Sequence, residues 1–371
     1  MKITLDATAL LARRFGIGFY AENLVRSLAE IDRENRYQLL YQYVRPARRE
    51  PYLPSAPNFR PLRRRLPYFL ADLLYNPFGL VGDGFVGRAD LFHALRGFLP
   101  RCRRVKTVWT LYDLAFKVNP GWFTPETAAG LEKVTRRNLD RADHVITISE
   151  HTREDLVRFY GYPAERITPI LLGVPRHALE PDEDDEILAA HPDAPMPYFL
   201  FVGTLEPRKN VVRLVEAFSR LDTPHSLVLV GAQGWMSEPI FSAIAASPRR
   251  EKILWRNYCS AAELERLYRH AEVFVYPSLY EGFGLPVLEA MAHGCPVITA
   301  RTSSLPEVGG DAVVYVDPED TADLADEMHT LATSERIRNA LAEKGRARAA
   351  NFSWQETARK TLEVYRRVNA S

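Results

Sequence analysis

Short apolar runs rich in β-branched and aromatic residues alternate with helical patterns along this chain, and they do so twice. The runs of the first half are Ile3–Leu5, Leu39–Val44, Leu91–His93, Val105–Leu111 and Val145–Ile148. Those of the second half are Phe199–Val202, Leu227–Val230, Val273–Tyr276, Val297–Thr299 and Val313–Val316. Strand alternating with helix is typical of a mostly parallel, doubly wound sheet. Because 371 residues exceed the size at which one hydrophobic core stops growing, we predict two such α/β domains.

A proline-containing stretch, Leu171–Pro197, separates the two halves and includes the acidic run Asp182–Glu186. Such a composition is typical of a linker and surface loop. We therefore place the N-terminal domain at residues 1–171 and the C-terminal domain at residues 172–354. Ligands of doubly wound sheets bind beyond the carboxyl ends of the strands, so the functional residues are expected in the turns that follow the apolar runs.

The net charge of +1 conceals an asymmetry between the halves. Residues 1–175 carry 27 Lys and Arg against 18 Asp and Glu, and the remainder carries 21 against 29. Part of the excess lies in Arg60, Arg63, Arg64 and Arg65. This cluster is either a solvated basic face or a contact for an anionic membrane surface or acceptor. No nucleic-acid recognition motif accompanies the charge, so we expect no nucleic-acid partner.

The start of the chain does not resemble a signal peptide, because Asp6 interrupts it before a long apolar run develops. No stretch reaches the roughly 20 apolar residues of a membrane helix, and the three cysteines are widely spaced. We expect a cytoplasmic protein in a reducing setting, with peripheral contact to the membrane as a further expectation.

The strongest motif is Tyr280–Ala290, which directly follows the apolar run Val273–Tyr276. Its glycines, Gly282 and Gly284, precede a predicted helix, and backbone N–H groups at a helix N-terminus bind anions. Glu281 and Glu289 supply carboxylates, which accept hydrogen bonds from sugar hydroxyls. The alternative interpretation is a helix-capping turn with two solvated glutamates.

A second motif, Gly203–Asn210, also lies between an apolar run and a helical pattern. Arg208 and Lys209 place two cations at this turn, where a diphosphate leaving group would need them as negative charge grows on it. The alternative is a merely basic helix start, but cations are disfavoured at helix N-termini. The placement therefore favours a functional role.

A third glycine turn, Arg13–Tyr20, contains Gly16 and Gly18 but lacks the third glycine of a dinucleotide fingerprint. It gives weak support to NAD binding and is compatible with a close approach of the backbone to phosphate or sugar.

Two other sequence features are more simply explained without a ligand. The acidic triplet Asp182–Asp184 matches a metal-binding Asp-x-Asp formally, but no strand precedes it, so no metal is expected. His93 could reach an acceptor, although a packed histidine is the simpler account.

The three glycine-containing motifs, together with Val145–Ser149, Leu172–Val174 and Ser303–Asp311, resemble those of the family 4 retaining glycosyltransferases. The resemblance covers nearly the whole chain. It implies the GT-B fold, in which two Rossmann-like domains face each other across a cleft. It also implies that a C-terminal helix crosses back, so that residues 355–371 return to the N-terminal domain.

The resemblance also implies roles for individual residues. Arg208 and Lys209 would bind the donor diphosphate, and Glu289 the ribose hydroxyls. Glu281 and the backbone of the next turn would hold the transferred sugar. The implied donor-binding set is Gly16, Gly203, Thr204, Arg208, Lys209, Tyr258, Glu281, Phe283, Gly284, Leu285, Glu289, Ser303 and Ser304.

One position departs from the family pattern. The family commonly has a His-Asp pair where this chain has Tyr112 and Asp113. Tyrosine is a poorer base than histidine at neutral pH. We name Glu281, Asp113 and Tyr112 as the candidate catalytic residues, and interpret the tyrosine as a sign that this branch uses no protein base there.

Taken together, the resemblance implies a retaining, metal-independent transferase without a cofactor. It would move a hexose, mannose or a related sugar, from a nucleotide diphosphate sugar, GDP-linked, to a glycan or lipid-linked acceptor. The alternatives are a sugar nucleotide epimerase or phosphorylase of the same fold, and a non-catalytic partner that binds a nucleotide sugar.

Overall fold

A computed structural model describes residues 1–11, 16–43, 52–66, 82–174 and 194–370. The chain divides into two compact units. The first contains Met1–Lys117, Glu126–Gly173 and Ser353–Ser371, and the second contains Val118–Pro125 and Val174–Phe352. The two long divisions lie within two residues of the predicted limits at 171 and 354. The acidic triplet Asp182–Asp184 lies outside the described residues.

The first unit is built on a seven-stranded sheet in which every adjacent pair is parallel. Its order is β3-β2-β1-β4-β5-β6-β7. The strands are β1 (Lys2–Asp6), β2 (Arg36–Gln42), β3 (Phe59–Arg64), β4 (Leu91–Ala94), β5 (Lys106–Leu111), β6 (His144–Thr147) and β7 (Ile167–Pro169). Its helices are α1 (Ile17–Ile31), α3 (Ala115–Val118), α4 (Pro125–Leu139), α5 (Glu150–Tyr160) and α14 (Trp354–Ala370), with short 3-10 turns at Thr8–Leu11 and Ala164–Arg166.

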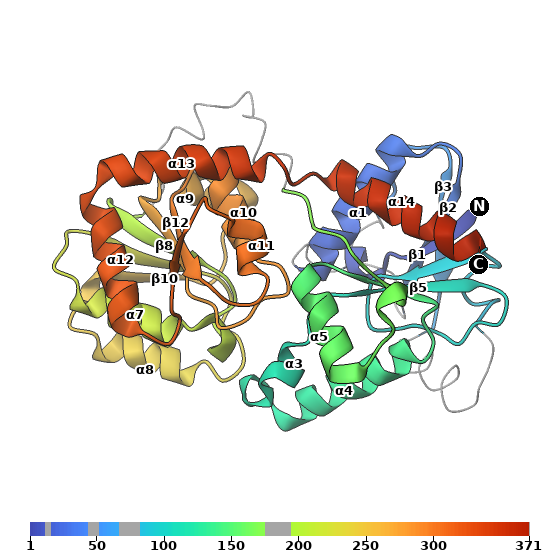
Figure 1. Ribbon diagram of the computed structural model, residues 1–371, viewed down its shortest axis with the longest axis horizontal. Helices are drawn as coiled ribbons and strands as arrows, with labels where there is room; N and C mark the ends of the chain where they lie inside the picture. The colour runs from blue at the N-terminus through green and yellow to red at the C-terminus, as the bar shows by residue number, and fades with distance from the viewer. Residues whose placement is uncertain (12–15, 44–51, 67–81, 175–193, 371) are drawn as a thin grey trace. The chain divides into compact units, whose positions relative to one another are not determined.

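The C-terminal helix α14 belongs to the first unit, as the resemblance implied. In Figure 1 it lies alongside α1, and the rings of Phe19 and Trp354 meet edge to face with their centroids 5.9 Å apart. Tyr365 of α14 contacts the fully buried His93 of β4 through a hydrogen bond of 2.6 Å. His93 is therefore the packed histidine of the simpler account, because its other ring nitrogen bonds Thr110 at 2.8 Å.

The second unit repeats the plan with a six-stranded, all-parallel sheet of order β10-β9-β8-β11-β12-β13. The strands are β8 (Tyr198–Val202), β9 (Ser226–Val230), β10 (Ile253–Arg256), β11 (Val273–Tyr276), β12 (Val297–Ala300) and β13 (Val314–Val316). The helices are α7 (Val211–Arg220), α8 (Glu238–Ala246), α9 (Ala261–His270), α10 (Leu285–Ala292), α11 (Leu305–Gly309), α12 (Thr321–Thr333) and α13 (Glu335–Ala349), with 3-10 turns at Pro207–Lys209 and Arg250–Lys252. The central strands are buried on both faces, which is why they appear as continuous apolar runs.

One segment falls in a different unit from the one we predicted. Val118–Pro125 lies within the first half of the sequence but belongs to the second unit. Its aromatic residues account for this, since Phe123 stacks on Trp235 at 5.7 Å and Trp122 lies 6.4 Å from the Tyr280 ring. The Trp235 indole N–H also donates to the Trp122 carbonyl at 2.6 Å. Among the described residues, no helix is both long and apolar enough to cross a membrane.

Candidate active site

The strand order of the second unit determines where its functional loops meet. Chain connections run outward in opposite directions from β8 and β11, which are neighbours in the sheet. Such a switch point separates the loops that follow the two strands and creates a ligand site at their carboxyl ends. The two motifs with the strongest sequence signals, Gly203–Asn210 and Tyr280–Ala290, are the loops that follow these two strands.

The loop after β8 is held by backbone contacts with the loop after β9. Leu205 N–H donates to the Ala232 carbonyl at 2.9 Å, and Gly231 approaches so closely that an added Cβ would lie 2.0 Å from the Gly203 oxygen. At the end of the loop, Asn210 adopts the left-handed conformation with φ 59°, which asparagine tolerates better than most residues. Its amide donates to the carbonyls of Pro277 and Pro318, so the turn carrying Arg208 and Lys209 is tied to the loop after β11.

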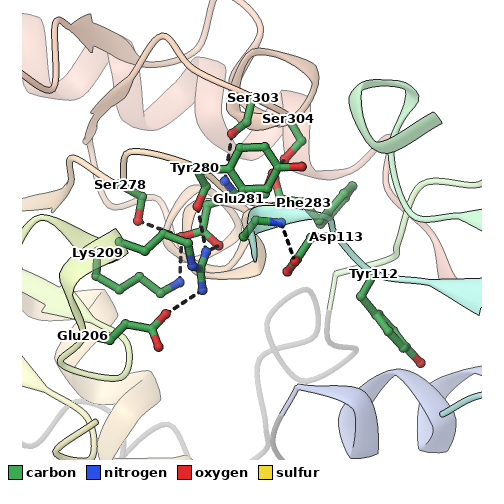
Figure 2. Close-up of polar contacts among 12 residues, drawn as sticks. Tyr112, Asp113, Glu206, Lys209, Ser278, Tyr280, Glu281, Phe283, Ser303 and Ser304 are labelled. Carbon is green, nitrogen blue, oxygen red and sulfur yellow. Dashed lines mark hydrogen bonds and ion pairs between the residues drawn. The ribbon is translucent and has the colours of Figure 1, made fainter. Parts of the chain in front are cut away.

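The two cations of this turn both form ion pairs with Glu281. Figure 2 shows Lys209 pointing toward this carboxylate. Oε1 of Glu281 accepts hydrogen bonds from Lys209 Nζ at 2.6 Å, the Ser278 hydroxyl at 2.7 Å and the Tyr276 hydroxyl at 3.0 Å. Arg208 forms an ion pair of 3.0 Å with Oε2. Two groups that the sequence indicated separately are therefore one buried cluster.

Arg208 has two further partners within the cluster. One guanidinium nitrogen donates to the Tyr280 carbonyl, and the other donates to Glu206, both at 2.6 Å. Glu206 is 2% exposed. Two cations and two carboxylates thus share a volume from which water is nearly excluded.

Burial and the charges of neighbouring groups shift the pKa values of these side chains in opposite directions. Burial alone would raise the pKa of Glu281, but Arg208 and Lys209 outweigh it and hold that pKa at about 2. Burial lowers the pKa of Lys209, and Glu281 opposes the shift. Burial raises the pKa of Glu206 above its ordinary value, although Arg208 and Lys209 act in the other direction. Glu281 is therefore a stable carboxylate, and Glu206 is the weaker acid of the two.

Ser303 and Ser304 support the same loop through its backbone. The Ser303 hydroxyl accepts a hydrogen bond of 2.8 Å from the Glu281 N–H. The Ser304 hydroxyl donates to the carbonyls of Glu281 and Phe283, each at 2.8 Å. Both hydroxyls thus hold the backbone around Glu281, and direct contact of these serines with the donor stays a prediction.

The turn before α10 has the geometry expected of an anion site. Gly284 precedes the helix with φ 111°, a conformation that favours glycine, and α10 then begins at Leu285. Phe283 is 3% exposed, so its ring is packed inward while its backbone belongs to the turn. The N–H groups at the start of such a helix attract negative charge.

Glu289 lies one turn into α10 and pairs with a residue that the sequence did not indicate. Its Oε2 accepts a hydrogen bond of 3.0 Å from the Tyr268 hydroxyl, and the Tyr268 ring stacks on His293. Burial raises the pKa of Glu289 to about 7, and the hydrogen bond from Tyr268 opposes this. This side chain therefore changes charge near neutral pH.

Thr204 and Tyr258 are two further predicted donor-binding residues of this unit. Thr204 is exposed on the loop after β8, and Tyr258 is 62% exposed between β10 and α9. Their roles in donor binding stay predictions, as do those of Gly203 and Leu285.

The remaining candidates belong to the first unit. Gly16 precedes α1 with φ 50° and accepts a backbone hydrogen bond from Tyr20. Asp113 accepts a hydrogen bond of 3.1 Å from the Ala115 N–H. Arg13 and Arg14, at the start of the third glycine motif, lie outside the described residues.

Tyr112 replaces the histidine expected at its position, and its hydroxyl already has a hydrogen-bond acceptor. It donates to the Leu95 carbonyl at 2.8 Å, and the ring meets Tyr20 edge to face. Burial raises the pKa of Tyr112 well above its ordinary value. The phenol is therefore protonated at neutral pH and cannot act as a base, and any other catalytic role for Tyr112 stays a prediction.

Glu206, Tyr268, Tyr276 and Ser278 complete the site but were not indicated by sequence reasoning. Tyr276 ends the apolar run Val273–Tyr276, and Ser278 lies between this run and the strongest motif, which was the available signal. Within the described ranges, no group of three or more His, Cys, Asp or Glu residues is arranged to hold a metal ion.

Two doubly wound parallel sheets with a returning C-terminal helix are typical of the GT-B fold found in glycosyltransferases. Similarity to solved structures agrees with this fold. The chain matches sucrose-phosphate synthase from Thermosynechococcus elongatus with a TM-score of 0.78 at 22% identity, over 100% of this chain and 99% of that one. It also matches the Anabaena protein HepE, solved with UDP-glucose, with a TM-score of 0.70 at 16% identity over 98% of both chains.

Sequence comparison identifies the family. A model described as "Glycosyl transferases group 1" matches residues 184–348, and one described as "Glycosyltransferase Family 4" matches residues 16–177. The O-antigen chain mannosyltransferase B of Escherichia coli is 32% identical over 285 residues, 74% of each chain. The serotype-specific mannosyltransferase WbdA of Escherichia coli is 29% identical over 239 residues, which are 62% of this chain and 29% of WbdA. This chain belongs to the family 4 glycosyltransferases.

Proposed function

We propose that this protein transfers a mannosyl residue from a GDP-linked donor to a glycan or lipid-linked acceptor, with retention of configuration and without a metal ion. The observation that carries the proposal is the buried cluster of Arg208, Lys209 and Glu281 at the switch point of the second sheet. The choice of mannose rests on relatives whose names specify mannosyltransferases.

In the proposed reaction, the bond between the sugar C1 and the β-phosphate oxygen breaks, and its electron pair goes to the phosphate. The acceptor hydroxyl oxygen bonds to C1 on the same face and transfers its proton to the departing phosphate oxygen. Arg208 and Lys209 would stabilise the charge that grows on the diphosphate, which is the main catalytic contribution such a site can make. A side-chain base is not required, which is compatible with a protonated Tyr112.

Other residues would orient the donor. The ribose hydroxyls would donate to Glu289, and the transferred sugar would contact Glu281 and the turn before α10. Contact with an anionic membrane through Arg60, Arg63, Arg64 and Arg65, and a cytoplasmic location, are further parts of the proposal. Three of these arginines lie on the edge strand β3, where Arg60 and Arg63 are exposed.

The decisive experiment is turnover with a panel of radiolabelled nucleotide sugars, including GDP-mannose, UDP-glucose and UDP-N-acetylglucosamine, against mannose oligosaccharides and a lipid-linked glycan. We expect mannosyl transfer from GDP-mannose that persists in EDTA, and an α-linked product by NMR. Donor binding with no product across the panel would indicate a non-catalytic partner instead. Formation of a sugar phosphate only with inorganic phosphate would indicate a phosphorylase.

The phosphate assignment is tested by Arg208→Ala. Because the removed contacts involve a charged group, we expect donor affinity to fall roughly 10- to 100-fold. Arg220→Ala, an exposed arginine at the end of α7, is the matched control and should bind like the wild type. Unchanged affinity in Arg208→Ala would remove the basis of the proposal.

A further inference from the structure

The charges of the proposed donor site cancel in the absence of ligand. Arg208 and Lys209 provide two positive charges, and Glu206 and Glu281 provide two negative ones. All four groups are nearly buried, with side-chain exposures of 13% for Arg208, 10% for Lys209, 3% for Glu206 and 9% for Glu281. Taken together, these four described side chains therefore carry no net positive charge before a diphosphate binds.

A bound diphosphate adds two negative charges to this volume. Like charges repel strongly where water is excluded, so the added charges favour a loss of charge or a change of position for one of the two carboxylates. The two carboxylates differ in the hydrogen bonds and ion pairs that they form.

Glu281 is held as an anion. Three donors converge on its Oε1, from Lys209, Tyr276 and Ser278, and Arg208 pairs with Oε2. A proton on this carboxyl group would disrupt several of these contacts at once.

The Glu206 carboxylate accepts fewer hydrogen bonds than that of Glu281. Among the described side chains, only Arg208 donates a hydrogen bond to it, from the second guanidinium nitrogen at 2.6 Å. The loop after β9 also comes close to it, since a Cβ added at Gly234 would lie 3.3 Å from the Glu206 Cβ. Losing the charge of Glu206 therefore weakens one contact, the hydrogen bond from the second guanidinium nitrogen of Arg208.

We propose that Glu206 takes up a proton from solvent when a nucleotide diphosphate sugar binds, which releases one side of Arg208 to the phosphate. The four side chains then carry a net charge of +1 instead of zero, opposite the two negative charges of the diphosphate. Glu206 is therefore a positioning residue that accepts a hydrogen bond from Arg208 in the absence of donor and loses this role when the donor binds. The inference rests on the proposed function, because it assumes that the donor diphosphate occupies this cluster.

The charged and titratable groups that face Glu206 come from two loops. Arg208 and Lys209 belong to its own turn, and Glu281 comes from the loop after β11, with Tyr276 behind it. The loop after β9, residues 231–237, contains no titratable side chain. Burial already raises the pKa of Glu206, and removal of Arg208 to a phosphate together with two added negative charges would raise it further.

Proton uptake can be measured by titration calorimetry. GDP-mannose is titrated into the protein at pH 7 in phosphate and in Tris, and the difference in binding enthalpy gives the protons exchanged. A nucleotide sugar is the right probe, because its diphosphate is a diester and lacks the ionisation near pH 6 of a terminal phosphate. UDP-glucose serves as the second probe.

The comparison that decides is wild type against Glu206→Gln. We expect the wild type to take up about 0.5 to 1 more proton per bound donor than the variant, and its Kd to rise up to about tenfold more from pH 7 to pH 8. Glu216→Gln, an exposed glutamate on α7, should match the wild type. Equal proton numbers in wild type and Glu206→Gln, with donor bound to both, overturn the proposal.

Glu289 has to be distinguished from Glu206 in these titrations, because burial raises the pKa of Glu289 to about 7. The same comparison is therefore repeated in a Glu289→Gln background, where adding Glu206→Gln should still lower the number of protons taken up. Disappearance of the difference in that background overturns the assignment to Glu206. If neither probe binds, the proposed function itself is overturned, and this inference with it.

A measurement on the wild type alone covers the case in which Glu206→Gln does not fold. Infrared difference spectra recorded with and without GDP-mannose should show a new carbonyl stretch of a protonated carboxyl group. Donor binding without that band overturns the proposal.

Discussion

The Lys209 ammonium lies 2.6 Å from the Glu281 carboxylate, and the two side chains are only 10% and 9% exposed. They come from loops about 70 residues apart in the sequence that meet because β8 and β11 are neighbours in the sheet. A buried ion pair of this kind is costly to break from one side, since the remaining charge stays without its partner. The pair therefore links the binding chemistry of the second unit to its stability.

Lys209→Met should destabilise the protein, because methionine keeps the length of the side chain but leaves Glu281, among the described residues, with Arg208 as its only cation. We expect the free energy of unfolding to fall by about 2 to 4 kcal/mol. Urea unfolding followed by tryptophan fluorescence measures it. The double variant Lys209→Met, Glu281→Gln should lose less than the sum of the single losses, and strict additivity would show that the two groups are not coupled.

Glu289→Gln should stabilise the protein in a pH-dependent way. The folded-state pKa of Glu289 is raised to about 7 from an ordinary value of 4.5, so the wild type loses stability as pH rises through this range. The gain from the substitution should be roughly 2 kcal/mol larger at pH 8 than at pH 5. Thermal unfolding at both values measures it, with Glu216→Gln as control. An equal effect at both values would contradict the shift.

Tyr365→Phe should weaken the attachment of α14 to the first sheet. It removes the hydrogen-bond partner of His93 Nδ1 in a fully buried position, which costs about 1 to 3 kcal/mol. Burial lowers the pKa of His93 to about 3, so its contribution is present at neutral pH and is lost as pH falls below 6.5. Hydrogen exchange of α14 amides should accelerate in the variant, and unchanged exchange would show that the contact does not hold the helix.

Gly231→Ala should disturb the loop that carries Arg208 and Lys209. The new Cβ would lie 2.0 Å from the Gly203 carbonyl oxygen, at a backbone φ of +147°. We expect a loss of about 2 to 3 kcal/mol in unfolding free energy and weaker nucleotide binding. Gly161→Ala is the control, because its φ is also positive but its Cβ would meet no atom within 4 Å. Equal losses in both variants would show that backbone conformation alone, and not the contact between loops, is responsible.

The apolar runs predicted the central strands of both sheets, but β3, β7 and β10 were missed. All three are at sheet edges, and β3 has exposed arginines where a central strand has apolar side chains. An edge strand needs only one buried face, so its sequence pattern is weak. The arginines that indicated a basic surface are, in the structure, also part of a strand.

The loops were predicted better than the contacts between them. Glycine and proline placement indicated that Gly203–Asn210 and Tyr280–Ala290 are turns before helices, because these residues restrict the local backbone. The interaction of Glu206 with Arg208 and of Tyr268 with Glu289 was not predicted. Neither pair has a spacing or pattern that distinguishes it from a solvated charge.

What the amino-acid sequence determined by itself is the alternation of strand and helix, the two-domain plan, and the cations and carboxylates that follow β8 and β11. These are local properties, set by side-chain type and backbone preference over a few residues. Only the tertiary structure decided that Lys209, Tyr276 and Ser278 share one oxygen of Glu281, and that the Tyr112 hydroxyl is committed to Leu95. The reason is that burial and pairing, which determine charge and protonation, depend on which loops the sheet order brings together.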